Sequence, residues 1–190
     1  MFYVLSITLA TLIIALANLI AAGVCTARLY FKLTLTTSLG VIAVIAIDGF
    51  LAFIARRLPE RWFSPDVALF NVTKRERLIY RRLKINRWKS LVPELGCFTG
   101  FHKDKVREPS SAEYIARFIT ESNYGVLGHI LGAVLGFAII FIPKLPLSVS
   151  LPIAAVNFIL NILPTMILRF NTPPLKRLYE RNLARDGATE

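Results

Sequence analysis

The sequence predicts an all-α, polytopic membrane protein with four transmembrane helices and a basic, helical interfacial segment in the cytoplasm between the second and third. Three observations predict this class. The 190 residues are 55% hydrophobic, with a mean hydropathy of +0.56, which is too apolar for a soluble domain that must cover its surface with polar groups. Four apolar runs each approach the roughly 20 residues that a bilayer requires. Basic residues gather in two segments, with 15 of the 23 Lys and Arg between residues 56 and 117 and five from residue 169 onward.

The chain is interpreted as one membrane domain covering residues 1–190. The first run carries no charged side chain and follows no Lys or Arg, so we interpret it as a retained span rather than a signal peptide. Pro143 and Pro146 separate the third run from the fourth. The predicted spans are 2–27, 33–55, 124–142 and 147–168, with a cytoplasmic loop at 56–123 and a cytoplasmic tail at 169–190.

The distribution of basic residues predicts the orientation. Cytoplasmic loops of membrane proteins carry an excess of Lys and Arg, so both termini and the long loop are expected on the cytoplasmic side. The formal net charge of +11 suits contact with anionic lipid headgroups. Nucleic acid is not an expected partner, because the four spans leave no soluble domain to bind it. Cys25 and Cys97 fall in separate segments, which predicts neither a disulfide framework nor a metal site.

Four polar side chains interrupt the apolar runs. Asp48 lies eight residues from Arg56, Asn161 eight from Arg169, and His129 eight from Glu121. At about 1.5 Å per residue, each lies roughly 12 Å from its cytoplasmic boundary, which predicts that they meet at one level of the inner leaflet. The fourth polar residue, Asn157, lies one turn deeper. Intramembrane ionisable residues mark functional sites, although the same residues could simply hold the helices together by hydrogen bonds.

One face of the third span carries His129 together with small residues. At about 100° per residue, His129 shares this face with Phe118, Glu121, Gly125, Gly132 and Gly136, and Gly128 lies beside it. Glycines at four-residue spacing permit close helix contact, so His129 is expected to point toward protein. Ser110 and Glu113 form the pattern of a capping box, which predicts a helix start that either runs into the span or bends at Gly125.

The cytoplasmic loop contains one amphipathic segment, residues 74–84. Its apolar stripe is interrupted by Glu76, and the opposite stripe is basic, as in a helix that lies on an anionic membrane surface. Glu76 is interpreted equally well as a surface residue paired with a neighbouring Arg or as a site residue. Between Ile85 and Lys103, Gly and Pro exclude a long helix, and aromatic residues such as Trp88 lie among cations as in an interfacial belt.

Three blocks of residues resemble the bacterial glycosyl-4,4'-diaponeurosporenoate acyltransferase family of carotenoid biosynthesis, over roughly residues 70–180. The first block comprises Glu76, Tyr80, Ile85, Arg87, Trp88, Lys89, Pro93, Phe101 and Lys103; the second is Glu121 with His129; the third comprises Asn161, Pro164, Arg169, Phe170, Asn171, Pro173 and Leu175. Val126, Ile130, Leu168 and Thr172 depart from the family pattern. The resemblance implies an acyltransferase of the bacterial inner membrane that moves a fatty acyl group onto a sugar hydroxyl of a glycosylated lipid.

For this chemistry His129 is the expected general base, because it is the only imidazole within the spans. We expect Asp48 to orient the imidazole, Glu121 to bind sugar hydroxyls and Asn161 to donate to the oxyanion. The resemblance adds further substrate-binding candidates: Glu76, Trp88, Lys89, Arg169 and Asn171. No bound cofactor or metal is expected. Acyl-CoA is a candidate donor, whose phosphates could contact Arg81, Arg82, Arg87 and Lys89, although headgroup contact explains these cations better.

Two other functions remain open. A small membrane methyltransferase is suggested by the size of the chain and by its basic C-terminal segment from Arg169 to Arg185. A lipid-binding or scaffolding subunit is favoured by Val126, which stands where the family pattern has a second acidic residue.

Overall fold

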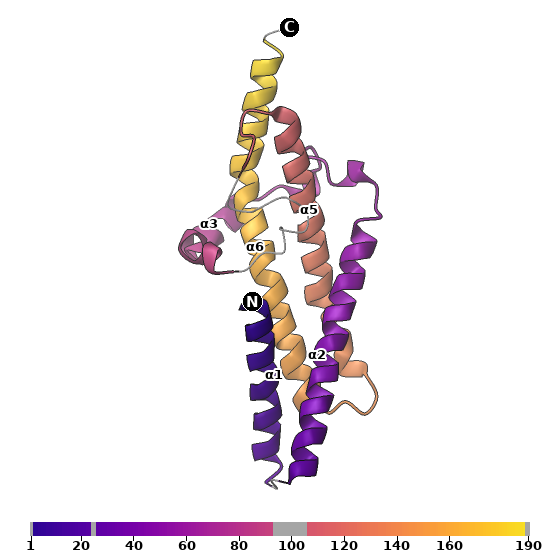
Figure 1. Cartoon of the computed structure of the whole chain (residues 1–190). Helices are drawn as coiled ribbons and strands as arrows, with labels where there is room; N and C mark the ends of the chain where they lie inside the picture. The colour runs from indigo at the N-terminus through magenta and orange to yellow at the C-terminus, as the bar shows by residue number, and fades with distance from the viewer. Residues whose placement is uncertain (1, 24–25, 93–105, 189–190) are drawn as a thin grey trace. The chain divides into compact units, whose positions relative to one another are not determined.

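The computed structural model describes residues 2–23, 26–92 and 106–188, and every regular element in these ranges is helical. The predicted all-α class is therefore confirmed. The elements, coloured along the chain in Figure 1, are α1 (Phe2–Ala21), α2 (Ala27–Ala55), η1 (Glu60–Trp62), η2 (Ala68–Phe70), α3 (Lys74–Arg82), α4 (Ile85–Trp88), η3 (Lys89–Leu91), α5 (Ala112–Leu135), η5 (Gly136–Phe141) and α6 (Leu147–Asp186).

Within the described ranges, three helical segments are long and apolar enough to cross a membrane. They are α2, the combined stretch of α5 and η5 over Ala112–Phe141, and α6. The apolar stretch Ile7–Ala21 of α1 is shorter. The chain therefore has the helices of a membrane protein, and the fourth span stays a prediction.

Several helices are longer than the runs that predicted them. Helix α5 begins at Ala112 and continues through Gly125 to Leu135, so of the two alternatives the helix runs into the apolar stretch without a break. Helix α6 continues to Asp186, so most of the segment expected as a tail is helical. The start of α5 differs by one residue from the predicted capping box: Ser111 Oγ, not Ser110, accepts the backbone N–H of Tyr114, at 3.1 Å.

The segment after α2 follows the predicted pattern in its described part. Helix α3 occupies the amphipathic stretch, and the Thr73 hydroxyl caps it by accepting the backbone N–H of Glu76 at 3.1 Å. From Ile85 to Val92, where this described stretch ends, the chain forms only the four-residue α4 and the three-residue η3. Cys25, Cys97 and His102, with the family-block residues Pro93, Phe101 and Lys103, lie outside the described residues.

The chain divides into two compact units. Unit 1 comprises Met1–Leu51 and Ile130–Ile162; unit 2 comprises Ala52–His129 and Leu163–Glu190.

The core of unit 1 joins α1, α2, η5 and the start of α6. Its buried members are Ile14, Val44, Ile139, Val149, Ile153 and Ala154. Gly40 permits this packing, since a Cβ there would lie 2.9 Å from the Ile153 side chain. The Asn18 amide on α1 donates to the backbone oxygen of Ser148 at the start of α6, at 3.0 Å. The polar link and the apolar core together fix α1 against α6 within this unit.

The described residues of unit 2 form three small cores. The first sets α3 and α4 against α6 through Val72, Tyr80, Ile85 and Ile167. The second joins the beginning of α5 to the end of α6, which lie side by side in Figure 1, through Ile115, Phe118, Ile119 and Leu175. The third places the short elements η1 and η2 against α5 through Phe63, Phe70 and Val126. Each core therefore attaches part of the basic loop to a long helix.

Candidate functional site

Unit 1 contains a cluster of polar side chains formed by Asp48 on α2 with Asn157 and Asn161 on α6. The Asn161 amide donates to Asp48 Oδ2 at 2.9 Å and to Asn157 Oδ1 at 3.1 Å. The Asn157 amide donates to the Gly132 carbonyl at 3.1 Å, and its distance to Asp48 Oδ1 is 3.5 Å. Both asparagines are buried. The equal depth of Asp48 and Asn161 along their helices correctly predicts that they meet.

Two glycines make room for this cluster. A Cβ at Gly132 would lie 2.7 Å from Asp48 Oδ1 and 3.0 Å from Asn161 Oδ1. A Cβ at Gly136 would collide with the Asn157 amide nitrogen. The glycines therefore permit close contact, as predicted. In unit 1 the groups that lie against them are the polar side chains of Asp48, Asn157 and Asn161.

His129 and Glu121 lie two turns apart on α5, in the part of that helix that belongs to unit 2. His129 is half-buried. Because Asp48 and Asn161 belong to unit 1, their convergence with His129 stays a prediction. The neighbouring Gly128 would place a Cβ 3.8 Å from the Ala52 backbone, so this face of α5 does approach the end of α2.

Glu121 has a partner that sequence reasoning missed. Arg56 Nη2 at the end of α2 contacts Glu121 Oε2 at 2.6 Å, and the same guanidinium lies 5.8 Å from the centre of the Tyr124 ring. The signal was present, because Arg56 and Glu121 are charged residues at the predicted cytoplasmic boundaries of their apolar runs and are therefore expected at the same level. The pair is partly exposed, with 47% of the Arg56 side chain accessible, so its contribution to stability is small.

A second polar cluster joins α3 to α6 in unit 2. Arg169 approaches the Glu76 carboxylate with two nitrogens, Nε at 2.5 Å and Nη2 at 2.8 Å, in a bidentate ion pair. The Tyr80 hydroxyl donates to the same carboxylate. Glu76 therefore pairs with an arginine, as one of its two interpretations predicted. The arginine is not a neighbour on the same helix but lies 93 residues away in the sequence. We call Glu76, Tyr80 and Arg169 the α3–α6 latch.

The environment of the latch fixes its charge states. Burial alone would raise the pKa of Glu76, but the hydrogen bonds from Arg169 and Tyr80 outweigh burial and hold that pKa below its usual value. Burial, and after it the bond from its hydroxyl to the Glu76 carboxylate, raise the pKa of Tyr80. At neutral pH the latch therefore holds an ionised Glu76 and a neutral Tyr80.

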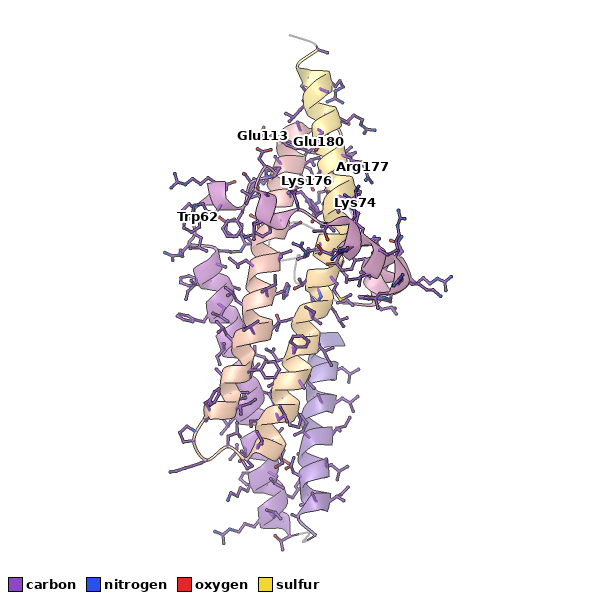
Figure 2. All side chains as sticks on the ribbon, turned by 180° about the vertical axis from the view of Figure 1, so that it is seen from behind. Trp62, Lys74, Glu113, Lys176, Arg177 and Glu180 are labelled. Carbon is purple, nitrogen blue, oxygen red and sulfur yellow. The ribbon has the colours of Figure 1, made fainter. Side chains whose placement is uncertain are left out.

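Asn71 extends the latch and was not predicted. Its backbone oxygen accepts from Arg169 Nη2 at 3.2 Å, and its side-chain oxygen accepts from the Lys176 ammonium at 2.6 Å. Asn71 lies just before α3, while Figure 2 labels Lys176 on α6. An isolated Asn in a loop gives no sequence signal for such a long-range role.

Two further predicted site residues, Trp88 and Lys89, have packing partners in the same region, and a third is partly exposed. The Trp88 indole N–H donates to the Leu83 carbonyl at 2.9 Å, and its ring packs on the core that contains Tyr80 and Ile85. The Lys89 ammonium lies 5.7 Å from the centre of the Phe170 ring. Asn171, which follows Phe170 on α6, is partly exposed.

Val126, which departs from the family pattern, has a structural role. It is 2% exposed and packs with Phe63 and Phe70. A carboxylate in this setting would be buried among aromatic rings at a high desolvation cost. The apolar residue is therefore consistent with the local packing of η1 and η2 on α5.

Among the residues that the structure describes, no group of three or more His, Cys, Asp or Glu side chains is arranged to hold a metal ion.

Comparison with known proteins gives one family. The sequence pattern of glycosyl-4,4'-diaponeurosporenoate acyltransferases matches residues 59–181. No curated protein matches, and no solved structure matches. The matched range contains Glu76, Glu121, His129, Arg169 and Asn171, whereas Asp48 lies before it.

Proposed function

Because this chain belongs to the glycosyl-4,4'-diaponeurosporenoate acyltransferase family, we propose that it transfers a fatty acyl group onto a sugar hydroxyl of a glycosylated lipid such as a glycosyl carotenoid. The observation that carries the proposal is the match over residues 59–181, a range that includes both the latch and the stretch of α5 with Glu121 and His129. Membership of the family makes the chain an acyltransferase of carotenoid biosynthesis by class, and the particular acceptor is our proposal.

In the proposed reaction His129 is the general base. Its imidazole takes the proton from the sugar hydroxyl while the hydroxyl oxygen attacks the acyl carbon of an activated thioester. The new carbon–oxygen bond forms, the carbon–sulfur bond breaks, and the imidazolium returns the proton to the departing thiolate. No Ser or Cys lies in a recognisable nucleophile motif, which favours direct transfer without an acyl-enzyme.

The other site residues assist this step. Glu121 binds sugar hydroxyls near the headgroups, and its ion pair with Arg56 supports a fixed position for the carboxylate. Asp48 orients the imidazole. Asn161 donates to the oxyanion, and in the resting structure both hydrogens of its amide have acceptors in Asp48 and Asn157. Oxyanion donation would therefore draw one hydrogen away from these bonds.

The substrate-binding residues form a second group in the proposal. It contains Glu76, Trp88, Lys89, Arg169 and Asn171, which come from α3, α4, η3 and α6. Glu76 and Arg169 satisfy each other, which supports a role in shaping the wall of the site rather than in pairing with a charged substrate.

The proposed topology places the reaction on the cytoplasmic side of the bacterial inner membrane. Four spans cross the bilayer, with α1 as the first, and both termini and the loop of residues 56–123 face the cytoplasm. The clustering of 15 of the 23 basic residues within residues 56–117 supports this orientation. An apolar acceptor could then enter from the inner leaflet, and partners are membrane lipids, the acceptor and the donor.

Lipid extracts test the proposal. Cells that make a glycosyl carotenoid are compared with and without the protein by mass spectrometry. The expected result is a product heavier than the acceptor by one fatty acyl group less water, seen only when the protein is present. A lipid heavier by one methyl group, or an unchanged lipid profile, would replace the proposal with the methyltransferase or the scaffold.

A further inference from the structure

A groove with a volume of about 480 Å³ opens in unit 2 beside the α3–α6 latch. This size lies within the usual range for sites of small organic ligands. It is lined by residues of α3, α4 and α6 with the segments beside them: Val72, Arg77, Tyr80, Arg81, Lys84, Ile85, Asn86, Arg87, Phe170, Pro173, Pro174 and Arg177. We call it the basic groove.

The charged residues described in the lining of the basic groove are all positive. Among the described residues, five cations line the basic groove and no carboxylate does; the cations are Arg77, Arg81, Lys84, Arg87 and Arg177. Among the described residues none of the five is in an ion pair. The carboxylate on the same helix, Glu76, is already engaged by Arg169 and Tyr80. Five like charges around one hollow repel each other, and an anion with several phosphates would relieve that repulsion.

The floor of the basic groove is apolar and firmly packed. Ile85 is fully buried, while Val72 and Tyr80 are 8% and 7% exposed, and all three belong to one core with Phe170 against it. The rings of Tyr80 and Phe170 meet edge to face, with their centres 6.5 Å apart. An apolar floor below a cationic rim suits a ligand that has phosphates together with an aromatic base and an apolar arm. Inorganic phosphate lacks the aromatic and apolar parts.

We infer that the basic groove binds the phosphate-bearing head of a CoA-type acyl thioester, which makes it the donor site of the proposed acyl transfer. This inference rests on the proposed function. A CoA-type carrier has a phosphate monoester, with about −1.5 to −2 charge at pH 7, and a diphosphate bridge. The carrier's carbon–sulfur bond is the one that breaks, and the free thiol leaves with the proton from the sugar hydroxyl. Arg81 and Arg87, two of the cations that sequence reasoning considered for phosphate contact, line the groove, while Arg82 and Lys89 do not.

Helix α3 offers a matched pair of double variants. R77Q with R81Q removes two cations that line the basic groove, and K74Q with R75Q removes two cations of the same exposed helix that do not. Figure 2 labels Lys74 on α3 and Arg177 on α6. The two double variants change the net charge equally, so a difference between them reports position rather than total charge.

Binding of CoA itself is measured by calorimetry on the full-length protein in phosphatidylcholine nanodiscs at fixed salt. We expect R77Q with R81Q to weaken CoA binding by about tenfold or more, as the loss of two charge-assisted contacts should. We expect K74Q with R75Q to change it by less than about threefold. Equal losses in both variants, or no measurable CoA binding by the wild type, would overturn the inference.

A second arm distinguishes a lipid headgroup from the nucleotide. If phosphatidylglycerol in the nanodisc abolishes CoA binding to the wild type, the basic groove is a headgroup site and the inference is wrong. CoA binding can be measured without the acceptor lipid, so it is tested independently of product formation. An acylated lipid in cells without CoA binding would leave the proposed function standing and remove only the donor site, whereas CoA binding without an acylated lipid would remove the proposed function.

Discussion

At the scale of single residues, the α3–α6 latch is a polar arrangement outside the apolar segments that combines an ion pair with a tyrosine hydrogen bond. Its Glu76 accepts hydrogen bonds from both Arg169 and Tyr80, and the side chains of Glu76 and Arg169 are only 20% and 17% exposed. A hydrogen bond to a charged group at such a site contributes about 1.5–3 kcal/mol. The latch therefore sets how firmly α3, and with it the floor of the basic groove, is held on α6.

The first prediction follows from the charge of Glu76. E76Q should lower the unfolding free energy at pH 7 by about 1–3 kcal/mol, because it removes the ion pair and leaves Arg169 partly buried. The lowered pKa of Glu76 means that its stabilising effect is complete above the ordinary carboxyl pKa of 4.5 and disappears as the pH falls through the lowered value. Thermal unfolding in detergent is measured at pH 7 and below pH 4. The midpoint of the wild type should exceed that of E76Q at pH 7, and this difference should disappear in acid.

The exposed Glu180 on α6 provides the control for this measurement. E180Q should change stability by less than about 0.5 kcal/mol at either pH. If the difference in midpoint between wild type and E76Q persists or widens in acid, Glu76 is not held ionised by the latch.

Whether a site residue can be predicted from the sequence depends on whether a local pattern identifies its contact partner. The meeting of Asp48 with Asn161 could be predicted, because depth along an apolar helix depends only on residue count. The role of Glu76 could not be resolved, since its partner Arg169 lies 93 residues away and nothing local specifies the pairing. Asn71 was missed for the same reason, while Arg56 could have been paired with Glu121 from their common boundary level.

At the scale of elements, the helical type of the long apolar runs was predicted, whereas the positions of the helix ends were not. The ends are decided by single contacts, as at the start of α5, where Ser111 rather than Ser110 accepts the Tyr114 N–H. The continuation of α6 through Pro173 and Pro174 was also not predicted. Its second half is held in unit 2 by tertiary contacts such as the buried Leu175, which local propensity does not reveal.

The second prediction concerns the cap of α5. S111A should destabilise the protein by about 1 kcal/mol, because one N-terminal N–H of the helix loses its acceptor. S110A, one residue earlier, should have no measurable effect on the thermal midpoint. The reverse order of the two midpoints would show that Ser110 is the capping residue after all.

The third prediction concerns the approach of α5 to the polar cluster in unit 1. G132A should destabilise the protein by about 1–3 kcal/mol, since the new methyl group would overlap Asp48 Oδ1 and push it away from Asn161. G49A is the matched control on α2, because a Cβ there meets nothing within 4 Å. Thermal unfolding in detergent would contradict the account if both variants kept the wild-type midpoint.

At the scale of the whole molecule, the chain has the helices of a membrane protein, and its basic segments are proposed to face one side of the membrane. Three helices have the length and composition of spans, and α1 is proposed as a fourth. The fourth prediction is therefore topological. A reporter fused after residue 190 should be active on the cytoplasmic side, and one inserted at Lys144 should be active outside. A C-terminal reporter on the outer side would move the proposed site to the wrong face for a cytoplasmic donor.

The fifth prediction tests the central claim of acyl transfer with His129 as base. Purified protein in nanodiscs is given a radiolabelled acyl-CoA and a glycosyl carotenoid, and the labelled product is counted. A general base typically contributes about 10²–10⁴-fold to the rate, so H129A and the similarly sized H129Q should lose at least about a hundredfold. E121Q should lose less, because Glu121 is proposed only to position the sugar. Both His129 variants should keep the wild-type elution profile, which separates loss of catalysis from loss of folding. Wild-type product formation by folded H129A and H129Q would contradict the account.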